Sequence, residues 1–168
     1  MSYTILPNGT KEWRFEGKRH RTDGPAIEYT NGGKAWYING KRHRTDGPAV
    51  IFEDGSCEWY VNDKLHRDDG PAIDYISGTR MWCQHGTLHR TDGPAKLWSD
   101  GDQQWYLNGK RHRTDGPAVE HPDGRKEWWI NDIQLDQFTF WLLVNEQGTI
   151  RSTDLMDFDY SIITHTQP

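Results

Sequence analysis

The chain has 168 residues, of which 33% are hydrophobic and 12% are aromatic, and its formal net charge is −5. The hydrophobic share is lower than in ordinary globular domains, which excludes a thick core, whereas the aromatic share is too high for a disordered chain. The acidic balance argues against sequence-independent binding of extended nucleic acid. We therefore expect a thin folded structure that is stabilised by large, flat side chains.

The sequence predicts neither a membrane segment nor an export signal. No window approaches the length of about 18 apolar residues that a transmembrane helix needs. The first residues, MSYTILPNGT, lack a basic region followed by an apolar stretch. Two cysteines do not make a disulfide framework, so we expect Cys57 and Cys83 to be reduced thiols. These features favour a cytoplasmic protein, and no cofactor is expected.

The chain repeats with a period of 23 residues. The heptapeptide HRTDGPA, with one copy that reads HRDDGPA, begins at His20, His43, His66, His89 and His112. A tryptophan column with the same spacing comprises Trp13, Trp36, Trp59, Trp82, Trp105 and Trp128. A turn-forming dipeptide, such as Asp54-Gly55, recurs at the same interval. An unbroken period of this length is typical of a repeat array, in which each unit packs against its neighbours.

One unit, from Pro48 to Arg67, predicts two short strands. Residues 50–52 form the first and residues 58–61 the second, and Asp54-Gly55 supplies the hairpin turn between them. Asn62-Asp63 marks another turn. The expected fold is an all-β repeat array, with an elongated, twisted antiparallel sheet that grows by one hairpin per repeat over residues 1–134.

The segment 135–168 breaks the period and is expected to cap the array. Residues 135–147 predict a helix, with Asp136 as its N-cap and Gly148 at its end. Its apolar residues are expected to cover the open end of the sheet, namely Leu135, Phe138, Trp141 and Leu142. Residues 149–168 mix acidic and apolar residues, which fits either an extra strand or a peptide-like segment.

Strand alternation sorts the side chains into two predicted faces. Trp36 and Ile38 share one face. On the preceding strands, we expect Ile27 with Tyr29, and Val50 with Phe52, to form the matching apolar set on the packed side. The opposite face is expected to be polar with an aromatic row, and to carry Tyr37, Tyr60, Cys83, Tyr106 and Trp129 beside Glu28, Glu58, Asp74 and Glu120. Cys57 lies on the tryptophan side, so it is not expected to pair with Cys83.

The heptapeptide contains residue types of metal and catalytic sites, but its repetition favours a structural role. Column histidines two strands apart lie roughly 9–10 Å from one another, too far to share a zinc ion. An active site needs different residues that converge on one cavity, whereas this motif occurs five times. We predict no catalytic and no metal site. Instead, the aspartate is expected to cap its turn, the glycine to adopt a conformation denied to other residues, and the arginine to pair with a carboxylate.

Two surfaces are candidates for binding. Tyrosine and tryptophan anchor protein interfaces, so the first candidate is the aromatic row Tyr37, Tyr60, Tyr106 and Trp129. It could equally be cross-strand packing. The second is a basic edge that would dock on an acidic or phosphorylated ligand, and it comprises Arg19, Lys41, Arg42, Lys64, Lys110 and Arg111. The alternative is that the neighbouring aspartates neutralise this edge.

The repeat unit resembles the MORN repeat, an aromatic- and glycine-rich β-hairpin module of the same length. The similarity covers roughly residues 1–134 and is carried by Trp36, Asn39-Gly40, Lys41, His43 and Asp54-Gly55 and their equivalents. It is closer to the HRxDGPA variant arrays found among phage and large-virus proteins. H-R-T-D-G-P here replaces the H-G-x-G of ordinary MORN repeats, so we do not carry over the phospholipid contacts proposed for that family.

The resemblance implies a β-sheet scaffold that binds other proteins and has no enzymatic activity. If the source is a phage, it implies a host factor as the partner, such as a defence enzyme held inactive. The leading hypothesis is therefore a non-enzymatic protein-binding module. One alternative is the capture of a nucleotide or another phosphorylated ligand along the basic edge. Self-assembly into a homodimer is another.

Overall fold

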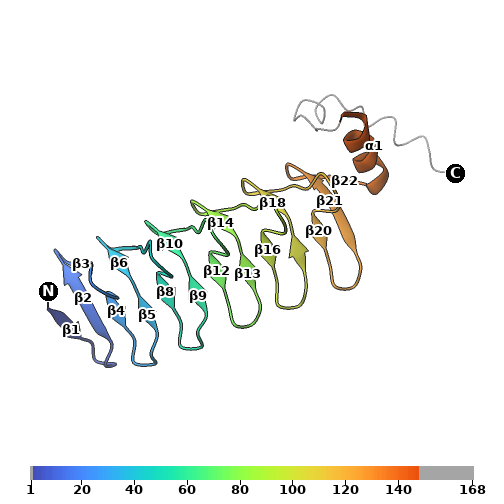
Figure 1. Cartoon of the computed structure of the whole chain (residues 1–168). Coiled ribbons are helices and arrows are strands. Elements are labelled where there is room, and N and C mark those ends of the chain that lie inside the picture. Colours follow the sequence, from blue (N-terminus) through green and yellow to red (C-terminus); the bar gives the residue numbers. More distant parts are fainter. Residues whose placement is uncertain (1, 148–168) are drawn as a thin grey trace.

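The computed structural model describes residues 2–147, which form an elongated stack of β-hairpins with one helix at the C-terminal end (Figure 1). The predicted all-β repeat array is confirmed. Most strands have only two residues, so stability cannot come from long strand ladders. No helix in the described part is long and apolar enough to cross a membrane.

The hairpins join into one 14-stranded antiparallel sheet that runs along the whole array. Neighbouring strands follow the chain order with two exceptions: the third strand pairs only with the second, off the main path, and a small hairpin is skipped in each of four repeats. The strands of this sheet are β1 (Tyr3–Ile5), β2 (Lys11–Phe15), β3 (Lys18–Arg19), β4 (Ile27–Glu28), β5 (Lys34–Ala35), β8 (Val50–Ile51), β9 (Cys57–Glu58), β12 (Ile73–Asp74), β13 (Arg80–Met81), β16 (Lys96–Leu97), β17 (Gln103–Gln104), β20 (Val119–Glu120), β21 (Lys126–Ile130) and β22 (Ile133–Leu135).

Each inner repeat adds a separate two-stranded hairpin along one edge of the array (Figure 1). These hairpins pair β6 (Tyr37–Ile38) with β7 (Lys41–Arg42), β10 (Tyr60–Val61) with β11 (Lys64–Leu65), β14 (Cys83–Gln84) with β15 (Thr87–Leu88), and β18 (Tyr106–Leu107) with β19 (Lys110–Arg111). Their two-residue turns need positive φ, and Asn39 and Gly40 supply it with φ values of 50° and 83°. The predicted strand 58–61 is therefore two strands in the structure.

The break falls at the tryptophan of each inner repeat. Trp36 belongs to neither β5 nor β6, and its backbone N–H donates to the carbonyl oxygen of Ala49 in the next unit at 2.8 Å. The N–H of His43 donates back to the Trp36 carbonyl at 3.1 Å. The tryptophan thus links the main sheet, the small hairpin and the next repeat. The alanines of the heptapeptide are fully buried at these links, namely Ala26, Ala49, Ala72, Ala95 and Ala118.

The strand register corrects the predicted faces. Ile27 lies opposite Ala35, and Val50 lies opposite Glu58, so these apolar residues share the face of the tyrosine column. We call this side the tyrosine face. Glu28 lies opposite Lys34 and Cys57 opposite Asp74, on the side of the tryptophans. The packed apolar residues were therefore predicted on the wrong face, whereas the separation of Cys57 from Cys83 is confirmed, and both are free thiols.

The C-terminal helix α1 (Gln137–Gln147) closes the last repeat (Figure 1). It begins two residues later than predicted, because Leu135 is the last residue of β22 and pairs with Trp128. Asp136 caps it as predicted, since its carboxylate accepts the N–H of Thr139 at 3.0 Å. The predicted end at Gly148 and the segment 149–168 lie outside the described residues.

The face of the helix that covers the sheet differs from the prediction. Phe140 and Leu143 are buried against Ile130 and Leu135, whereas Phe138 is 76% exposed. Trp141 and Leu142 are also exposed. The end of the array is therefore closed by a small apolar cluster in which Phe140 is the largest fully buried side chain.

Replacing Phe140 should weaken the packing of the helix on the last repeat. We expect Phe140→Ala to lower the free energy of unfolding by about 3–5 kcal/mol, because a fully buried aromatic ring leaves a cavity. Phe138→Ala is the matched control and should change it by less than about 0.5 kcal/mol. Urea unfolding followed by tryptophan fluorescence measures both, and equal effects would contradict the helix register.

Candidate functional site

The arginine of the heptapeptide is held by three contacts. In the second repeat the Arg44 guanidinium lies over the Trp36 ring, 4.1 Å from its centroid. Its Nε donates to Asp46 at 2.9 Å, and its Nη1 donates to the Pro48 carbonyl at 3.3 Å. The arginine–tryptophan stack occurs in five repeats, at 3.9–4.1 Å, in the pairs Arg21–Trp13, Arg44–Trp36, Arg67–Trp59, Arg90–Trp82 and Arg113–Trp105. The predicted arginine–carboxylate pairing is confirmed.

The glycine of the heptapeptide is needed because a side chain there would collide with the arginine of the same motif. Gly47 is not among the residues with positive φ, so the predicted special conformation is wrong. A Cβ atom on Gly47 would lie 3.0 Å from Cζ of Arg44, because the guanidinium packs directly over the glycine. The same close approach recurs at Gly24, Gly70, Gly93 and Gly116.

The histidine joins each repeat to the next. Nδ1 of His43 accepts the backbone N–H of Asn62 at 3.3 Å, and Arg44 N–H donates to the Tyr60 carbonyl at 3.0 Å. In the fourth repeat His85 replaces the asparagine and stacks on His66 at 4.4 Å. Within the described residues, no group of three His, Cys, Asp or Glu side chains is arranged to hold a metal ion. The contacts of the heptapeptide therefore belong to the fold.

The structure merges the two predicted binding surfaces into one packed layer. Arg42 of the basic edge lies over Tyr60 at 3.8 Å and pairs with Asp63 at 2.9 Å. Arg111 lies over Trp129 at 3.4 Å and pairs with Asp132 at 3.2 Å. In the same way, Arg19 covers Tyr37 and pairs with Glu12. These arginines are already neutralised.

Several predicted contact residues are consequently unavailable or only half available. Tyr60 is buried, while Tyr37, Tyr106 and Trp129 are half-buried. The three lysines of the basic edge, Lys41, Lys64 and Lys110, are exposed and form no ion pair with any other described residue. Burial, with the carboxylate of Glu58 nearby, raises the pKa of Tyr60 to about 12. This phenol therefore stays neutral at physiological pH and acts as a packing group.

A second aromatic column is more exposed, although two of its members, Tyr29 and Phe52, were predicted on the packed side. We call it the turn-side aromatic row, and it comprises Tyr29, Phe52, Tyr75 and Trp98, one per repeat. Tyr29, Phe52 and Trp98 are 42%, 41% and 38% exposed. The 23-residue spacing of these residues was visible in the sequence, but their exposure depends on the strand register.

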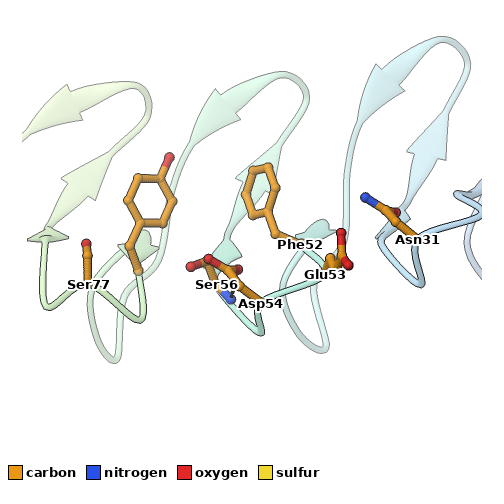
Figure 2. Close-up of a pocket in the computed structure, with 7 residues that line it drawn as sticks. Asn31, Phe52, Glu53, Asp54, Ser56 and Ser77 are labelled. Atoms are coloured by element: carbon orange, nitrogen blue, oxygen red, sulfur yellow. Dashed lines mark hydrogen bonds between the residues drawn. The ribbon is translucent and has the colours of Figure 1, made fainter.

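The row borders a surface pocket of about 490 Å³ between the hairpin turns of successive repeats. Figure 2 shows its lining, which comprises Asn31, Phe52, Glu53, Asp54, Ser56, Tyr75 and Ser77. The rings of Phe52 and Tyr75 meet edge to face, with centroids 6.0 Å apart. Behind them the Tyr75 hydroxyl donates to the buried carboxylate of Glu58, and burial together with Glu58 raises the pKa of Tyr75 to about 12.

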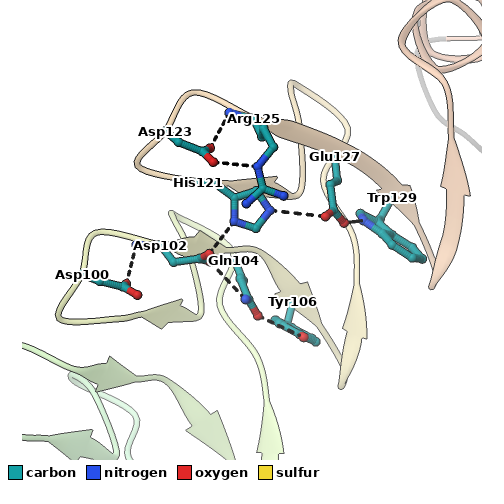
Figure 3. A network of polar contacts seen from close by, with 9 residues as sticks. All are labelled: Asp100, Asp102, Gln104, Tyr106, His121, Asp123, Arg125, Glu127 and Trp129. Carbon is teal, nitrogen blue, oxygen red and sulfur yellow. Dashed lines mark hydrogen bonds and ion pairs between the residues drawn. The ribbon is translucent and has the colours of Figure 1, made fainter.

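A polar network follows the same face in the last repeats (Figure 3). The His121 ring contacts two carboxylates, with Nδ1 2.6 Å from Asp102 and Nε2 3.3 Å from Glu127. The other oxygen of Glu127 accepts the indole N–H of Trp129 at 2.8 Å. These contacts to Glu127 and Asp102 raise the pKa of His121, because both favour the imidazolium.

The geometry defines the protein as an all-β repeat array with an aromatic, partly acidic face. No protein-family model matches the chain, and no curated protein matches it. Its function must therefore be inferred from its own side chains.

Two histidines should give opposite pH dependences of stability. The pKa of His121 is raised, so its contribution is present at low pH and is lost as pH rises through the folded-state value. Burial lowers the pKa of His112, so its contribution is present above the unfolded value and is lost as pH falls.

We therefore expect His121→Gln to destabilise the protein more at pH about 5.5 than at pH about 8.5, and His112→Gln to show the reverse. Urea unfolding of the wild type and both variants at the two pH values measures this. Identical pH dependence of the two variants would show that neither network holds its histidine as described.

Proposed function

We propose that this protein is a non-enzymatic binding module that recognises another protein through the turn-side aromatic row. The observation that carries the proposal is the exposure of Tyr29, Phe52 and Trp98 at equivalent positions of different repeats. Aromatic side chains dominate the energy of protein interfaces, because they bury a large area at a small entropic cost. Most other rings of the array are stacked under arginines or buried, so this row offers the aromatic area for a partner.

The repeat geometry also supports an interface. Equivalent residues lie two strands apart, roughly 9–10 Å along the sheet, so one partner surface could contact several members of the row. Each residue of the row directly follows a short strand of the continuous main sheet, which fixes its backbone position. A rigid surface binds with little loss of conformational entropy.

The nature of the partner is also part of the proposal. The resemblance to phage arrays points to a host protein in the cytoplasm, with a defence enzyme held inactive as one candidate. A phosphorylated ligand on the basic edge has less support, since Arg42 and Arg111 are paired with Asp63 and Asp132. Self-assembly into a homodimer remains the other alternative.

The proposal is tested with the double variant Phe52→Ser/Trp98→Ser. We expect a partner captured by the tagged wild-type protein from host lysate to bind this variant at least about tenfold more weakly, because interface aromatics are typical hot spots. Biolayer interferometry with the purified partner measures the affinity, and circular dichroism checks folding.

The matched control is Phe15→Ser, which removes an aromatic residue of similar exposure outside the row. It should bind like the wild type. Equal binding by all three proteins would remove the row as the interface. Light scattering of the wild type alone tests the homodimer, because a concentration-dependent dimer that the double variant abolishes would assign the row to self-association.

A further inference from the structure

The pocket beside Phe52 and Tyr75 combines aromatic and acidic groups. Glu53 and Asp54 line it from one turn, and Asn31, Ser56 and Ser77 complete its polar wall (Figure 2). None of the residues that line it is basic. Glu53 and Asp54 are exposed and form no ion pair with any described residue. The pocket therefore carries negative charge that the described part of the chain does not neutralise.

Elsewhere the array places a cation over its aromatic rings. Five tryptophans of the tryptophan column carry an arginine, and arginines also cover Tyr37, Tyr60 and Trp129. Each of these arrangements pairs a flat ring with a guanidinium that also meets an acidic side chain. A cation over a ring is attracted by the negative face of its π-system.

The turn-side aromatic row places a cation over a ring in one repeat. Lys96 lies over Trp98 with its Nζ 4.2 Å from the ring centroid. Lys96 occupies the column that holds Val50 and Ile73 in the preceding repeats. Phe52 and Tyr75 therefore lack this lysine, and no described cation lies over either ring. The pocket has the aromatic and acidic parts of the arrangement without its cation.

We infer that this pocket binds a lysine or arginine side chain of a protein partner, against Phe52 and Tyr75 and beside Glu53 and Asp54. The inference rests on the proposed function, because it names the chemistry of the partner for that same row. Charge complementarity identifies the occupant as a basic segment, and the net charge of −5 favours its approach. In the polar wall, Asn31 and Ser56 already accept the backbone N–H groups of Gly33 and Ile76, and the Ser77 hydroxyl offers a further acceptor for a guanidinium.

The test uses a short peptide of alternating arginine and glycine, titrated into the ¹⁵N-labelled protein at physiological salt. The control peptide carries citrulline, which keeps the shape of arginine without its charge. We expect saturable shifts of the amide signals of Asp54, Ser56 and Ser77 with the arginine peptide, and at least about fivefold weaker binding of the citrulline peptide. Equal binding of the two peptides, or shifts confined to other repeats, would overturn the inference.

A pair of charge variants gives the second control. Glu53→Gln/Asp54→Asn removes both carboxylates, and asparagine already occupies the equivalent turn position at Asn31, so the turn is retained. Asp100→Asn/Asp123→Asn changes the net charge equally at other turns. The first variant should bind the arginine peptide at least about fivefold more weakly, and the second should bind like the wild type. Equal losses would indicate non-specific attraction and overturn the inference.

The two proposals can fail separately. If Phe52→Ser/Trp98→Ser weakens the captured partner but Glu53→Gln/Asp54→Asn does not, the row is the interface and the cation pocket is refuted. If the arginine peptide binds in the pocket but no partner depends on the row, the pocket stands and the protein-binding function fails.

Discussion

The structure depends on the stacking of an arginine over a tryptophan in each repeat. The strands are too short and the hydrophobic content is too low for an ordinary core, so each unit needs another source of stability. A guanidinium over an indole contributes about 0.5–2 kcal/mol, depending on its burial. The same guanidinium also holds an aspartate and a proline carbonyl, and it packs on a glycine that leaves room for it. The heptapeptide HRTDGPA is therefore a folding motif, and its five copies are explained by five equivalent junctions.

This constraint determines where binding can take place. An arginine that stacks and pairs within the array can bind a ligand only by breaking these contacts. This would lower the stability of the fold, because a carboxylate and a ring would be left without their partner. Most rings of the tyrosine column are covered in the same way, by Arg19, Arg42 and Arg111. The turn-side aromatic row is different, because its residues project beside the hairpin turns where no repeated arginine reaches them. The row therefore offers exposed rings at equivalent positions of several repeats.

The sequence predicts the repeat and its turns well, because a strict period and Asn-Gly or Asp-Gly dipeptides are local signals. It misses the break at each tryptophan, which divides the predicted strand 58–61 in two. It does not predict which face is packed. Alternation relates Trp36 to Ile38 within one segment, but the face that Ile27 shares with Ala35 is set by the register across a turn. The helix shows the same limit. Phe138 and residues 140–144 are all apolar, so no single face stands out, and only the docking of Phe140 against Ile130 and Leu135 identifies it. The role of Gly47 was equally hidden, since the atom that it accommodates belongs to Arg44.

The most direct measurement is the stability of Arg67→Lys in the central repeat. Lysine keeps the charge but lacks the planar group that stacks on Trp59 and donates to both Asp69 and the Pro71 carbonyl. We expect the variant to lose about 1–3 kcal/mol of unfolding free energy in urea, because the stack and one hydrogen bond are lost. An unchanged unfolding curve would contradict the central claim, because it would show that the charge alone, and not the stacked guanidinium, stabilises the repeat.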